Sequence, residues 1–188
     1  MADQAPDSIQ RNLTLPKHIG FIMDGNGRWA SGHGLQREDG HKYGVDSIEN
    51  LIQHMSDVGI QYVTLYAFST ENWNRPKSEV TSIFSLLRST LSNKLERLIE
   101  ANIQVRHIGN LKSINNTTRI AIERAIDATI SNTGMTVIVA INYGGRKEIV
   151  DAVKTIIAAD IKPEEITEAT IEEHLYTSSI PHPDLIIR

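Results

Sequence analysis

Short apolar runs recur along the chain and alternate with longer segments that have helical periodicity. The runs predict strands over residues 18–23, 62–68, 103–108 and 135–141, and the beginning of a fifth strand at 185–187. Runs that are almost continuously apolar and are separated by helices are typical of a parallel sheet with helices on both faces. We therefore expect an α/β fold: a single domain with a mostly parallel central sheet flanked by helices.

Three of the intervening segments carry apolar residues at helical spacing. These stripes lie within residues 45–58, 80–98 and 149–157. An amphipathic helix buries its apolar stripe against a neighbouring element, so we expect all three stripes to pack against the sheet. The stripe within 80–98 could also line an apolar tunnel, but periodicity alone does not distinguish a tunnel wall from ordinary packing.

Composition narrows the class of protein. The chain has 188 residues, of which 40% are hydrophobic and only 5% aromatic, so one core built mainly from aliphatic side chains is expected. A net charge of −4 argues against broad, non-specific binding of nucleic acid. Because cysteine is absent, disulfides, thiolate metal sites and cysteine nucleophiles are excluded.

The first residues differ from the rest of the chain. Residues 1–14 are polar and of mixed charge, and we expect them to form a flexible tail before a domain over 15–188. They contain no apolar stretch of the secretory type, and no segment approaches the ~18 apolar residues of a membrane-spanning helix. We therefore expect a cytoplasmic protein.

The most informative polar segment follows the first predicted strand. Asp24 is followed there by Gly25, Asn26, Gly27 and Arg28. In open α/β sheets, ligands bind outside the carboxyl ends of the strands. Glycines at such a position allow backbone N–H groups to approach phosphate oxygens closely. This segment is therefore a candidate phosphate-binding site.

The charges of the same segment predict a metal ion. Arg28, Arg37 and His41 can supply positive charge, and a helix from about His41 would add its N-terminal dipole. Asp24 would repel a phosphate unless a cation lay between them, since unit charges ~4 Å apart interact by about 4 kcal/mol at an effective dielectric of 20. We favour Mg²⁺ bound by Asp24 over the alternative, in which the Asp24 side chain caps the turn.

A dinucleotide site is a competing interpretation. Gly25, Gly27 and Ala30 match the spacing G-x-G-x-x-A after a strand. That motif also requires an acidic residue at the end of the second strand, whereas Asp46 and Glu49 fall on a predicted helix. We therefore disfavour a nucleotide-binding oxidoreductase.

Further polar residues follow the other predicted strands, where they should reach the same edge of the sheet. The segment 66–76 carries Ser69, Glu71, Asn72, Trp73 and Arg75 in one short loop. Paired glycines follow the fourth strand at 144–145, and Arg188 ends the fifth. Loop residues held at such an edge are often functional. Each of these features, taken alone, is also compatible with an ordinary loop or surface residue.

Taken together, the motifs resemble the cis-prenyltransferase family. MDGNGRWA, YAFSTENWNRP, NYGGR and DLIIR follow one another in the order and spacing of that family, above all of its bacterial undecaprenyl diphosphate synthases, over about residues 15–188. The resemblance implies an Mg²⁺-dependent transferase that joins isopentenyl diphosphate to an allylic diphosphate such as farnesyl diphosphate. It further implies a homodimer, a hydrophobic tunnel beside the sheet, and a long product such as undecaprenyl diphosphate, the cell-wall carrier lipid. Such a product would bring the protein to a membrane surface.

The resemblance also implies roles for individual residues. Asp24 would bind Mg²⁺ and assist departure of the allylic diphosphate, and Asn72 would be the second catalytic residue. The allylic diphosphate would be held by Gly25, Asn26, Gly27, Arg28, Arg37 and His41. Isopentenyl diphosphate and the reacting carbon would be placed by Ser69, Asn72, Arg75 and Arg188. Phe68 and Trp73 would shape the mouth of the pocket, and Trp29, Thr70 and Glu71 would complete the substrate-binding set.

The family pattern extends beyond the DLIIR strand. Family members continue with further arginine, serine and glutamate positions, which complete the isopentenyl diphosphate site, the metal site and much of the dimer contact. We therefore expect this chain to be incomplete at its C-terminus and to bind the allylic substrate better than isopentenyl diphosphate. The alternative is a non-catalytic diphosphate-binding partner subunit, or a truncated inactive form.

Overall fold

The computed structural model describes residues 14–188, and it contains one five-stranded sheet. The predicted tail, 1–14, therefore lies outside the described residues except for its last position. The strands are β1 (His18–Ile22), β2 (Tyr62–Ser69), β3 (Gln104–Ile108), β4 (Thr136–Tyr143) and β5 (Leu185–Ile187). Their order is β3-β4-β2-β1-β5, and every pair of neighbours is parallel. The predicted α/β class and all five strand positions are confirmed, with ends that shift by one or two residues.

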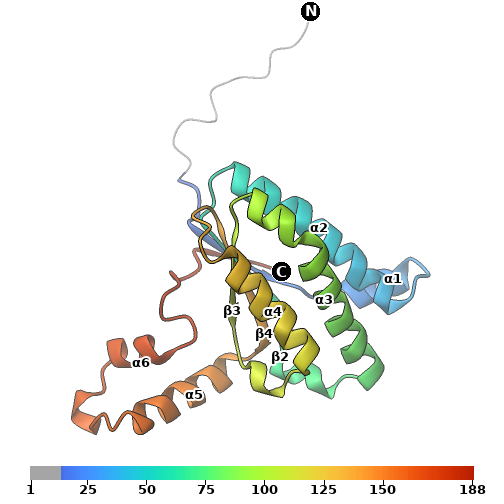
Figure 1. The fold of residues 1–188 in the computed structure, drawn as a ribbon. Coiled ribbons are helices and arrows are strands. Elements are labelled where there is room, and N and C mark those ends of the chain that lie inside the picture. The colour runs from blue at the N-terminus through green and yellow to red at the C-terminus, as the bar shows by residue number, and fades with distance from the viewer. Residues whose placement is uncertain (1–13) are drawn as a thin grey trace, which may run out of the picture.

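Within residues 14–188, six α-helices connect the strands (Figure 1). They are α1 (Asn26–Gly32), α2 (Arg37–Asp57), α3 (Lys77–Glu100), α4 (Asn116–Thr129), α5 (Gly145–Ala158) and α6 (Glu168–His174). The expected start of a helix near His41 was wrong by one turn, because α2 begins at Arg37. The glycine-containing segment after Asp24 is the first turn of α1.

One face of the sheet carries most of the core. Side chains of β1, β2 and β4, among them Phe21, Val63 and Val137, are buried against Ile52 of α2 and Leu98 of α3. Nearer the carboxyl ends of the strands, a second cluster joins β2 and β4 to α3 and α4. Burying one such aliphatic or aromatic side chain contributes about 1.5–3 kcal/mol, so this face fixes α2 and α3 above the sheet.

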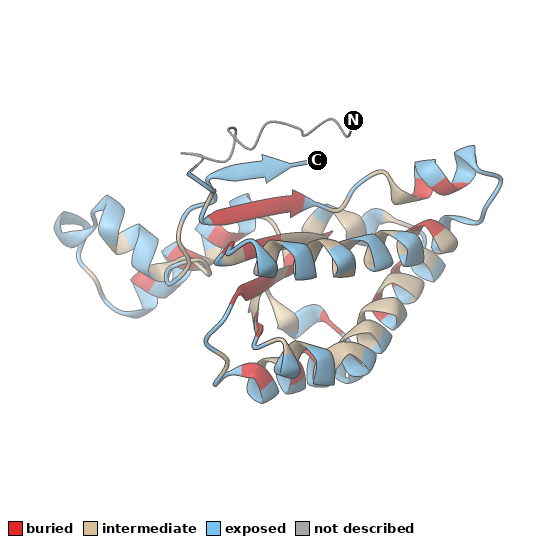
Figure 2. Cartoon of the chain, turned by 90° about the horizontal axis from the view of Figure 1, so that it is seen from above, coloured by how far each residue is buried: buried red, intermediate tan, exposed pale blue. Residues whose placement is uncertain are grey.

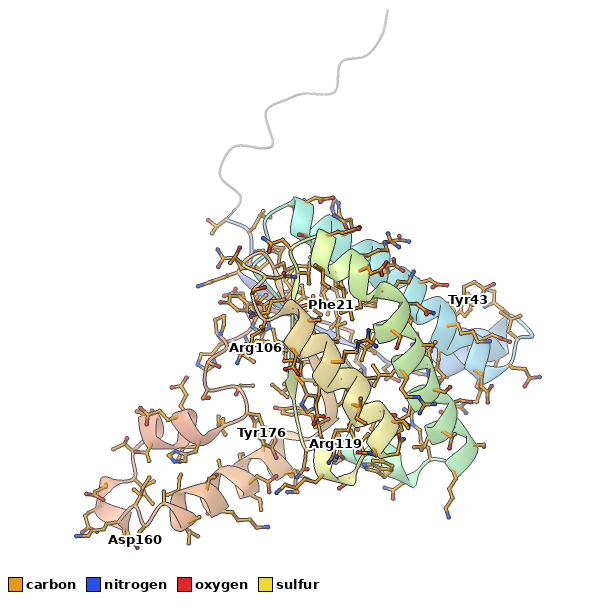
Figure 3. All side chains as sticks on the ribbon, viewed as in Figure 1. Phe21, Tyr43, Arg106, Arg119, Asp160 and Tyr176 are labelled. Carbon is orange, nitrogen blue, oxygen red and sulfur yellow. The ribbon has the colours of Figure 1, made fainter. Side chains whose placement is uncertain are left out.

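The opposite face is covered by the segment that returns from α6 to β5. Ile138 and Ala140 of β4 are buried there, with Tyr176 and Ile180 packed against their cluster. Arg106 donates a hydrogen bond to the Ser179 carbonyl oxygen over 3.1 Å and also contacts the Ser179 hydroxyl. Arg106 and Tyr176 are labelled in Figure 3, on the side of the sheet away from α3. Both faces are therefore covered, but by different kinds of element.

Helix α5 does not pack against the sheet along its predicted stripe. Ile156 is buried, but Ile149 is 55% exposed, Val153 44% and Ile157 70%. The helix runs away from the body of the molecule, with α6 as its neighbour (Figure 1). Helical periodicity identifies an apolar face but does not say what covers it, and the expectation that this stripe packs on the sheet was wrong.

Among residues 14–188, no further strand pairs with β5, which forms one edge of the sheet. All three residues of this strand are exposed, and Figure 2 shows the strand beside the buried β1. Within residues 14–188, no helix is long and apolar enough to cross a membrane.

Candidate active site

A cavity of about 470 Å³ lies between the sheet and the two helices α2 and α3. At the carboxyl ends of the strands its lining is polar, with Asp24, Asn26, His41, Ser69, Asn72 and Arg75. Along the two helices and the sheet the lining is mostly apolar, with residues such as Ile48, Ile52, Leu65, Leu87, Leu91 and Val137, and Glu49, Thr90 and Lys94 are its polar members there. The volume lies within the ~300–1,000 Å³ usual for small-molecule sites. The cavity therefore combines a polar mouth with an apolar interior.

Asp24 lies at this mouth, two residues beyond the end of β1. Its Oδ1 accepts a hydrogen bond from the Gly25 N–H over 2.7 Å, and Gly25 has a φ of +90°, which glycine adopts without strain. The turn-capping contact considered from the sequence is therefore present. It occupies one carboxylate oxygen and leaves Oδ2 for other partners.

Two arginines converge on the second oxygen of Asp24. Arg188 donates to Oδ2 over 2.5 Å, and an Arg28 nitrogen lies 3.6 Å from the same atom. The hydrogen bonds from Arg188 and then from Gly25 hold the pKa of Asp24 below its ordinary value, so this side chain is an anion at neutral pH. Residues far apart in the sequence thus meet here, because β1 and β5 are adjacent parallel strands.

Close packing of α1 on α2 fixes the residues that follow Asp24. A Cβ at Gly40 would collide with the carbonyl oxygen of Asn26, and one at Gly44 would lie 2.5 Å from the Asn26 amide nitrogen. The guanidinium of Arg37 covers Gly27, where an added Cβ would lie 2.9 Å from Nε. Small residues on both helices therefore allow the close approach that brings Asn26, which lines the cavity, near Arg37, which does not.

Trp29 lies outside the cavity lining. It stacks on His33 with ring centroids 4.4 Å apart and contacts Tyr43 at 5.1 Å, and its side chain is 43% exposed. Tyr43, labelled in Figure 3, marks this outer corner of the molecule. The structure thus brings Asp24, Asn26 and His41 to the cavity, but not Trp29.

His41, Arg75 and Glu79 form a cluster of ionisable side chains across the mouth. Arg75 Nη1 donates to Glu79 Oε1 over 3.1 Å, and His41 Nε2 lies 3.8 Å from the same oxygen. His41 Nε2 is buried and has no hydrogen-bond partner within the described part of the chain. Burial is the main cause that lowers the pKa of His41, and Glu79 opposes it. Glu79 thus links α2, α3 and the loop after β2.

The loop after β2 forms one turn of 3₁₀ helix, η1 (Thr70–Asn74). The Ser69 N–H donates to Asn72 Oδ1 over 3.0 Å, which fixes the Asn72 amide at the mouth. Trp73 points away from the cavity: its Nε1 donates to Asn142 Oδ1 over 2.7 Å, and its ring packs on Phe68. Phe68 itself lines the cavity. Trp73 therefore holds the loop in place through contacts on the side that faces away from the cavity.

Thr70 and Glu71 lie on the outer side of η1. Thr70 packs against Gly144, where an added Cβ would lie 2.5 Å from the threonine Oγ1. Glu71 is exposed and does not line the cavity, and a hydrogen bond from its own N–H is the main cause that lowers its pKa. Of the paired glycines after β4, Gly144 thus allows this loop to approach closely, whereas an added Cβ at Gly145 would meet nothing within 4 Å.

The side chains available as metal ligands determine how a metal ion would be bound at this site. Among residues 14–188 there is no group of three or more His, Asp or Glu side chains arranged around one point. Mg²⁺ does not require such a group, because it is commonly bound by one or two carboxylates together with substrate phosphates and water. Asp24, with one carboxylate oxygen at the mouth of the cavity, fits that mode of binding.

Sequence reasoning missed several residues of this site. Glu79 is the acidic residue of the first turn of α3, and its spacing of four residues from Arg75 was the available signal. Tyr66 and Tyr143 also line the cavity, although Tyr66 lies within a predicted strand and neither was given a role from the motifs that contain them. The dinucleotide interpretation is weakened, since Asp46 and Glu49 lie on α2 and not at the end of β2.

A parallel α/β sheet whose carboxyl edge holds a cation-rich mouth over an apolar cavity is suited to a ligand with an anionic head and an apolar tail. Comparison with known proteins agrees with this class. Residues 22–188 match the family model described as "Putative undecaprenyl diphosphate synthase". The chain belongs to this family of prenyl transferases.

Individual relatives support the assignment. The chain is 46% identical over 178 residues to an isoprenyl transferase of Heliobacterium mobile, a match that covers 93% of this chain and 68% of the relative. It is 44% identical over 178 residues to the ditrans,polycis-undecaprenyl-diphosphate synthase ((2E,6E)-farnesyl-diphosphate specific) of Micrococcus luteus, with 93% and 72% covered.

Solved structures show the same fold. Lavandulyl diphosphate synthase from Lavandula x intermedia, crystallised with dimethylallyl diphosphate, superposes with a TM-score of 0.88 at 35% identity, over 92% of this chain and 77% of that one. A probable undecaprenyl diphosphate synthase from Campylobacter jejuni gives a TM-score of 0.71 at 30% identity, over 87% and 71%.

Proposed function

We propose that this chain condenses isopentenyl diphosphate with an allylic diphosphate, farnesyl diphosphate, to make a long-chain polyprenyl diphosphate of the undecaprenyl type. The observation that carries the proposal is the cavity itself, whose mouth holds Asp24 among cationic side chains and whose interior is apolar. The name of the Micrococcus luteus relative supports the choice of farnesyl diphosphate and the long product.

The allylic substrate would place its diphosphate at the mouth and its hydrocarbon tail in the cavity. Asn26, His41 and the neighbouring Arg28 and Arg37 would hold the diphosphate oxygens. The tail would lie between α2 and α3, where each buried CH₂ contributes about 0.8 kcal/mol. A fifteen-carbon tail would thus gain up to about 12 kcal/mol before entropy losses, so the apolar cavity would dominate binding. The hydrophobic tunnel would be this cavity with its ligand bound.

Mg²⁺ would be held by Asp24 together with diphosphate oxygens. It would supply positive charge where negative charge grows as the allylic C–O bond breaks. Arg188 and Arg28 now contact Oδ2 of Asp24. They would turn from the carboxylate to the phosphates when substrate enters, and Oδ2 would then be available to Mg²⁺. Before substrate enters, the hydrogen bonds from Arg188 and Gly25 keep Asp24 ionised by lowering its pKa, and bound Mg²⁺ would favour the anion afterwards.

Isopentenyl diphosphate would bind on the other side of the mouth. Arg75 and Arg188 would hold its diphosphate, while Ser69 and Asn72 would place the alkene carbon against the allylic carbon. The new C–C bond forms as the allylic C–O bond breaks and diphosphate departs. One proton is then lost from the former isopentenyl carbon to an oxygen of the departing diphosphate or to water held by Asn72. Fixed cationic donors at the departing diphosphate are the larger part of such catalysis, since they need no reorganisation.

We further propose that the protein works as a homodimer. The exposed apolar residues of α5, Ile149, Val153 and Ile157 among them, form a surface that a second copy could cover. Sedimentation of the unmodified chain and of Ile157→Lys tests this. A dimer that the substitution converts to monomer is expected, and two monomeric samples would contradict it.

Calorimetric titration tests the substrate assignment. Farnesyl diphosphate in the presence of Mg²⁺ is expected to bind at least about tenfold more tightly than isopentenyl diphosphate, because only the farnesyl tail fills the cavity. Ile52→Asp, which places a charge in the apolar interior, should remove most of that preference. Equal affinities of the unmodified chain for the two compounds would contradict the assignment.

A further inference from the structure

Asn142 interrupts the pairing of β4 with β2 at the carboxyl edge of the sheet. Ile141 lies opposite Phe68, and Tyr143 lies opposite the next residue of β2. Asn142 is therefore an extra residue with no partner on β2, which makes it a β-bulge, a feature that often redirects side chains beside functional sites. Its backbone is left-handed, with a φ of +51°, a conformation that asparagine adopts more readily than most residues with a side chain.

The side chain of Asn142 joins the loops that follow β2 and β3. Its Oδ1 accepts the hydrogen bond from Trp73 Nε1, and its Nδ2 donates to the Asn110 carbonyl oxygen, each over 2.7 Å. The Asn110 N–H in turn donates to the Asn142 carbonyl oxygen over 3.3 Å. Only 6% of Asn142 is exposed. An asparagine amide carries both an acceptor and a donor, so this residue type satisfies both loops at once.

The packing around Asn142 leaves these loops little freedom. Gly109, with a φ of +116°, lies so close to β4 that an added Cβ would be 2.3 Å from a carbonyl oxygen of that strand. On the other side, the Trp73 ring packs on Phe68 and Phe84, with ring centroids 5.2 and 5.5 Å away. The end of β4 therefore holds the loop after β3 and the turn η1 in one arrangement.

Trp73 carries this constraint to the mouth of the cavity, because it directly follows Asn72 in η1. Asn72 and Ser69 line the cavity, whereas Trp73 and Asn142 do not. A shift of Trp73 would move the Asn72 amide relative to a ligand at the mouth, and a misplacement of ~1 Å can cost about 10²-fold in rate. The contact between Asn142 and Trp73 thus acts on the site from outside it.

We propose that Asn142 is a positioning residue, which acts through Trp73 to hold Asn72 at the mouth of the cavity. The proposal rests on the proposed function and deepens it, because it connects Asn142 to the side of the mouth where isopentenyl diphosphate would bind. Asn142 itself would touch neither substrate. Farnesyl diphosphate, held near Asp24 and between α2 and α3, would bind almost independently of it.

Three substitutions isolate the contact. Asn142→Gly removes the amide and leaves a residue that adopts the left-handed backbone without strain. The matched control is Asn102→Gly: Asn102 has a φ of +54° and its side chain bonds Thr133, but it lies before β3, at the opposite edge of the sheet. Trp73→Phe removes the same hydrogen bond from its other partner. Thermal unfolding shows which variants are folded, and Trp73→Phe carries the test if Asn142→Gly is not.

The first readout is spectroscopic and does not depend on activity. NMR of the isotope-labelled chain resolves the indole N–H of Trp73 and the side-chain amide of Asn72. In Asn142→Gly the indole proton is expected to move upfield, as it does when a hydrogen bond is lost, and the Asn72 amide should shift with it. In Trp73→Phe the Asn72 amide should shift in the same way, and in Asn102→Gly neither resonance should move. An Asn72 amide that keeps its position in Asn142→Gly and in Trp73→Phe would overturn the proposal.

The second readout separates positioning from general destabilisation. In Asn142→Gly, kcat for the condensation is expected to fall at least about tenfold, while KM for farnesyl diphosphate stays within about twofold. The double variant with Trp73→Phe should be no slower than the slower single variant, because both substitutions remove one contact. Losses that multiply in the double variant, or a kcat of Asn142→Gly equal to that of Asn102→Gly, would overturn the role of Asn142.

The outcomes also separate this proposal from the proposed function. If the unmodified chain binds neither diphosphate and forms no product, the proposed function fails and the role of Asn142 fails with it. If it binds both but does not turn over, the affinity for isopentenyl diphosphate replaces kcat, with the same expectations for each variant. If the unmodified chain is active and Asn142→Gly matches it, only the inference fails.

Discussion

His41 and Glu79 face each other at the mouth of the cavity, where the Glu79 carboxylate favours the protonated form of the imidazole. Burial lowers the pKa of His41 from its ordinary 6.5, the Arg75 and Arg37 guanidiniums lower it further, and the Glu79 carboxylate raises it. Glu79 escaped sequence reasoning because a glutamate in the first turn of a helix is common for reasons of the helix dipole alone. Its contact with His41 depends on the packing of α2 against α3, which the sequence pattern does not reveal.

Glu79→Gln should lower the pKa of His41 further. The substitution removes the group that favours the imidazolium, while burial and the two arginines still oppose it. The His41 ring resonances, followed by NMR as a function of pH, give the pKa directly, with Glu96→Gln as the matched control. A His41 pKa that is unchanged or raised in Glu79→Gln would show that the pair is not coupled.

Glu79→Gln should also change how stability depends on pH. Because the folded-state pKa of His41 lies below 6.5, the unfolded chain takes up this proton first, and stability is lost as the pH falls through that range. The loss should begin at the same pH in the variant and continue to lower pH. Urea unfolding between pH 7 and pH 5 measures it, and a steeper loss in the unmodified chain than in the variant would contradict the account.

At the scale of elements, the sequence located the strands well and the small helices badly. The strands were predictable because buried parallel strands are continuous apolar runs. Helix α1 was not, because its first turn contains glycine, asparagine and arginine, and its close packing against α2 cannot be seen in the sequence. Helix α5 was located, but its amphipathic pattern could not reveal that most of its apolar face lies away from the sheet.

Gly40→Ala should separate α1 from α2. The added Cβ would collide with the carbonyl oxygen of Asn26, and overpacking of this kind costs about 1–3 kcal/mol. Gly32→Ala is the matched control, because an added Cβ there meets nothing within 4 Å. Urea unfolding of both variants checks the prediction, and equal stabilities would show that the two helices can move apart freely.

Ile156 and Ile157 are neighbours on α5 with opposite surroundings. Ile156 is 2% exposed and Ile157 is 70% exposed. Ile156→Ala should therefore lower the free energy of unfolding by about 2–5 kcal/mol, whereas Ile157→Ala should change it by no more than about 0.5 kcal/mol in a dilute monomeric sample. A large effect of Ile157→Ala that persists on dilution would mean that this face of α5 is covered within the chain.

At the scale of the whole molecule, the parallel sheet assembles the site from distant segments. The residues after β1, β2 and β5 were predicted to share one edge because parallel strands end together, and the structure places Asp24, Asn72 and Arg188 at the carboxyl ends of those strands. Which of them face the cavity could not be predicted. Trp29, Glu71 and Trp73 belong to the same two motifs as Asp24 and Asn72, but their side chains do not line the cavity. The direction of each side chain depends on how α1 and η1 pack, which the motifs do not reveal.

The central claim is that the chain transfers prenyl groups through the site at Asp24. The most direct measurement mixes the purified chain with farnesyl diphosphate, labelled isopentenyl diphosphate and Mg²⁺, beside Asp24→Ala and the exposed control Asp46→Ala. The account predicts that label enters a long lipid with the unmodified chain and with Asp46→Ala. In Asp24→Ala the rate should fall by roughly 10²–10³-fold, the loss typical of removing one electrostatic contact to the transition state. A lipid product formed equally fast by Asp24→Ala, or none formed by the unmodified chain, would contradict it.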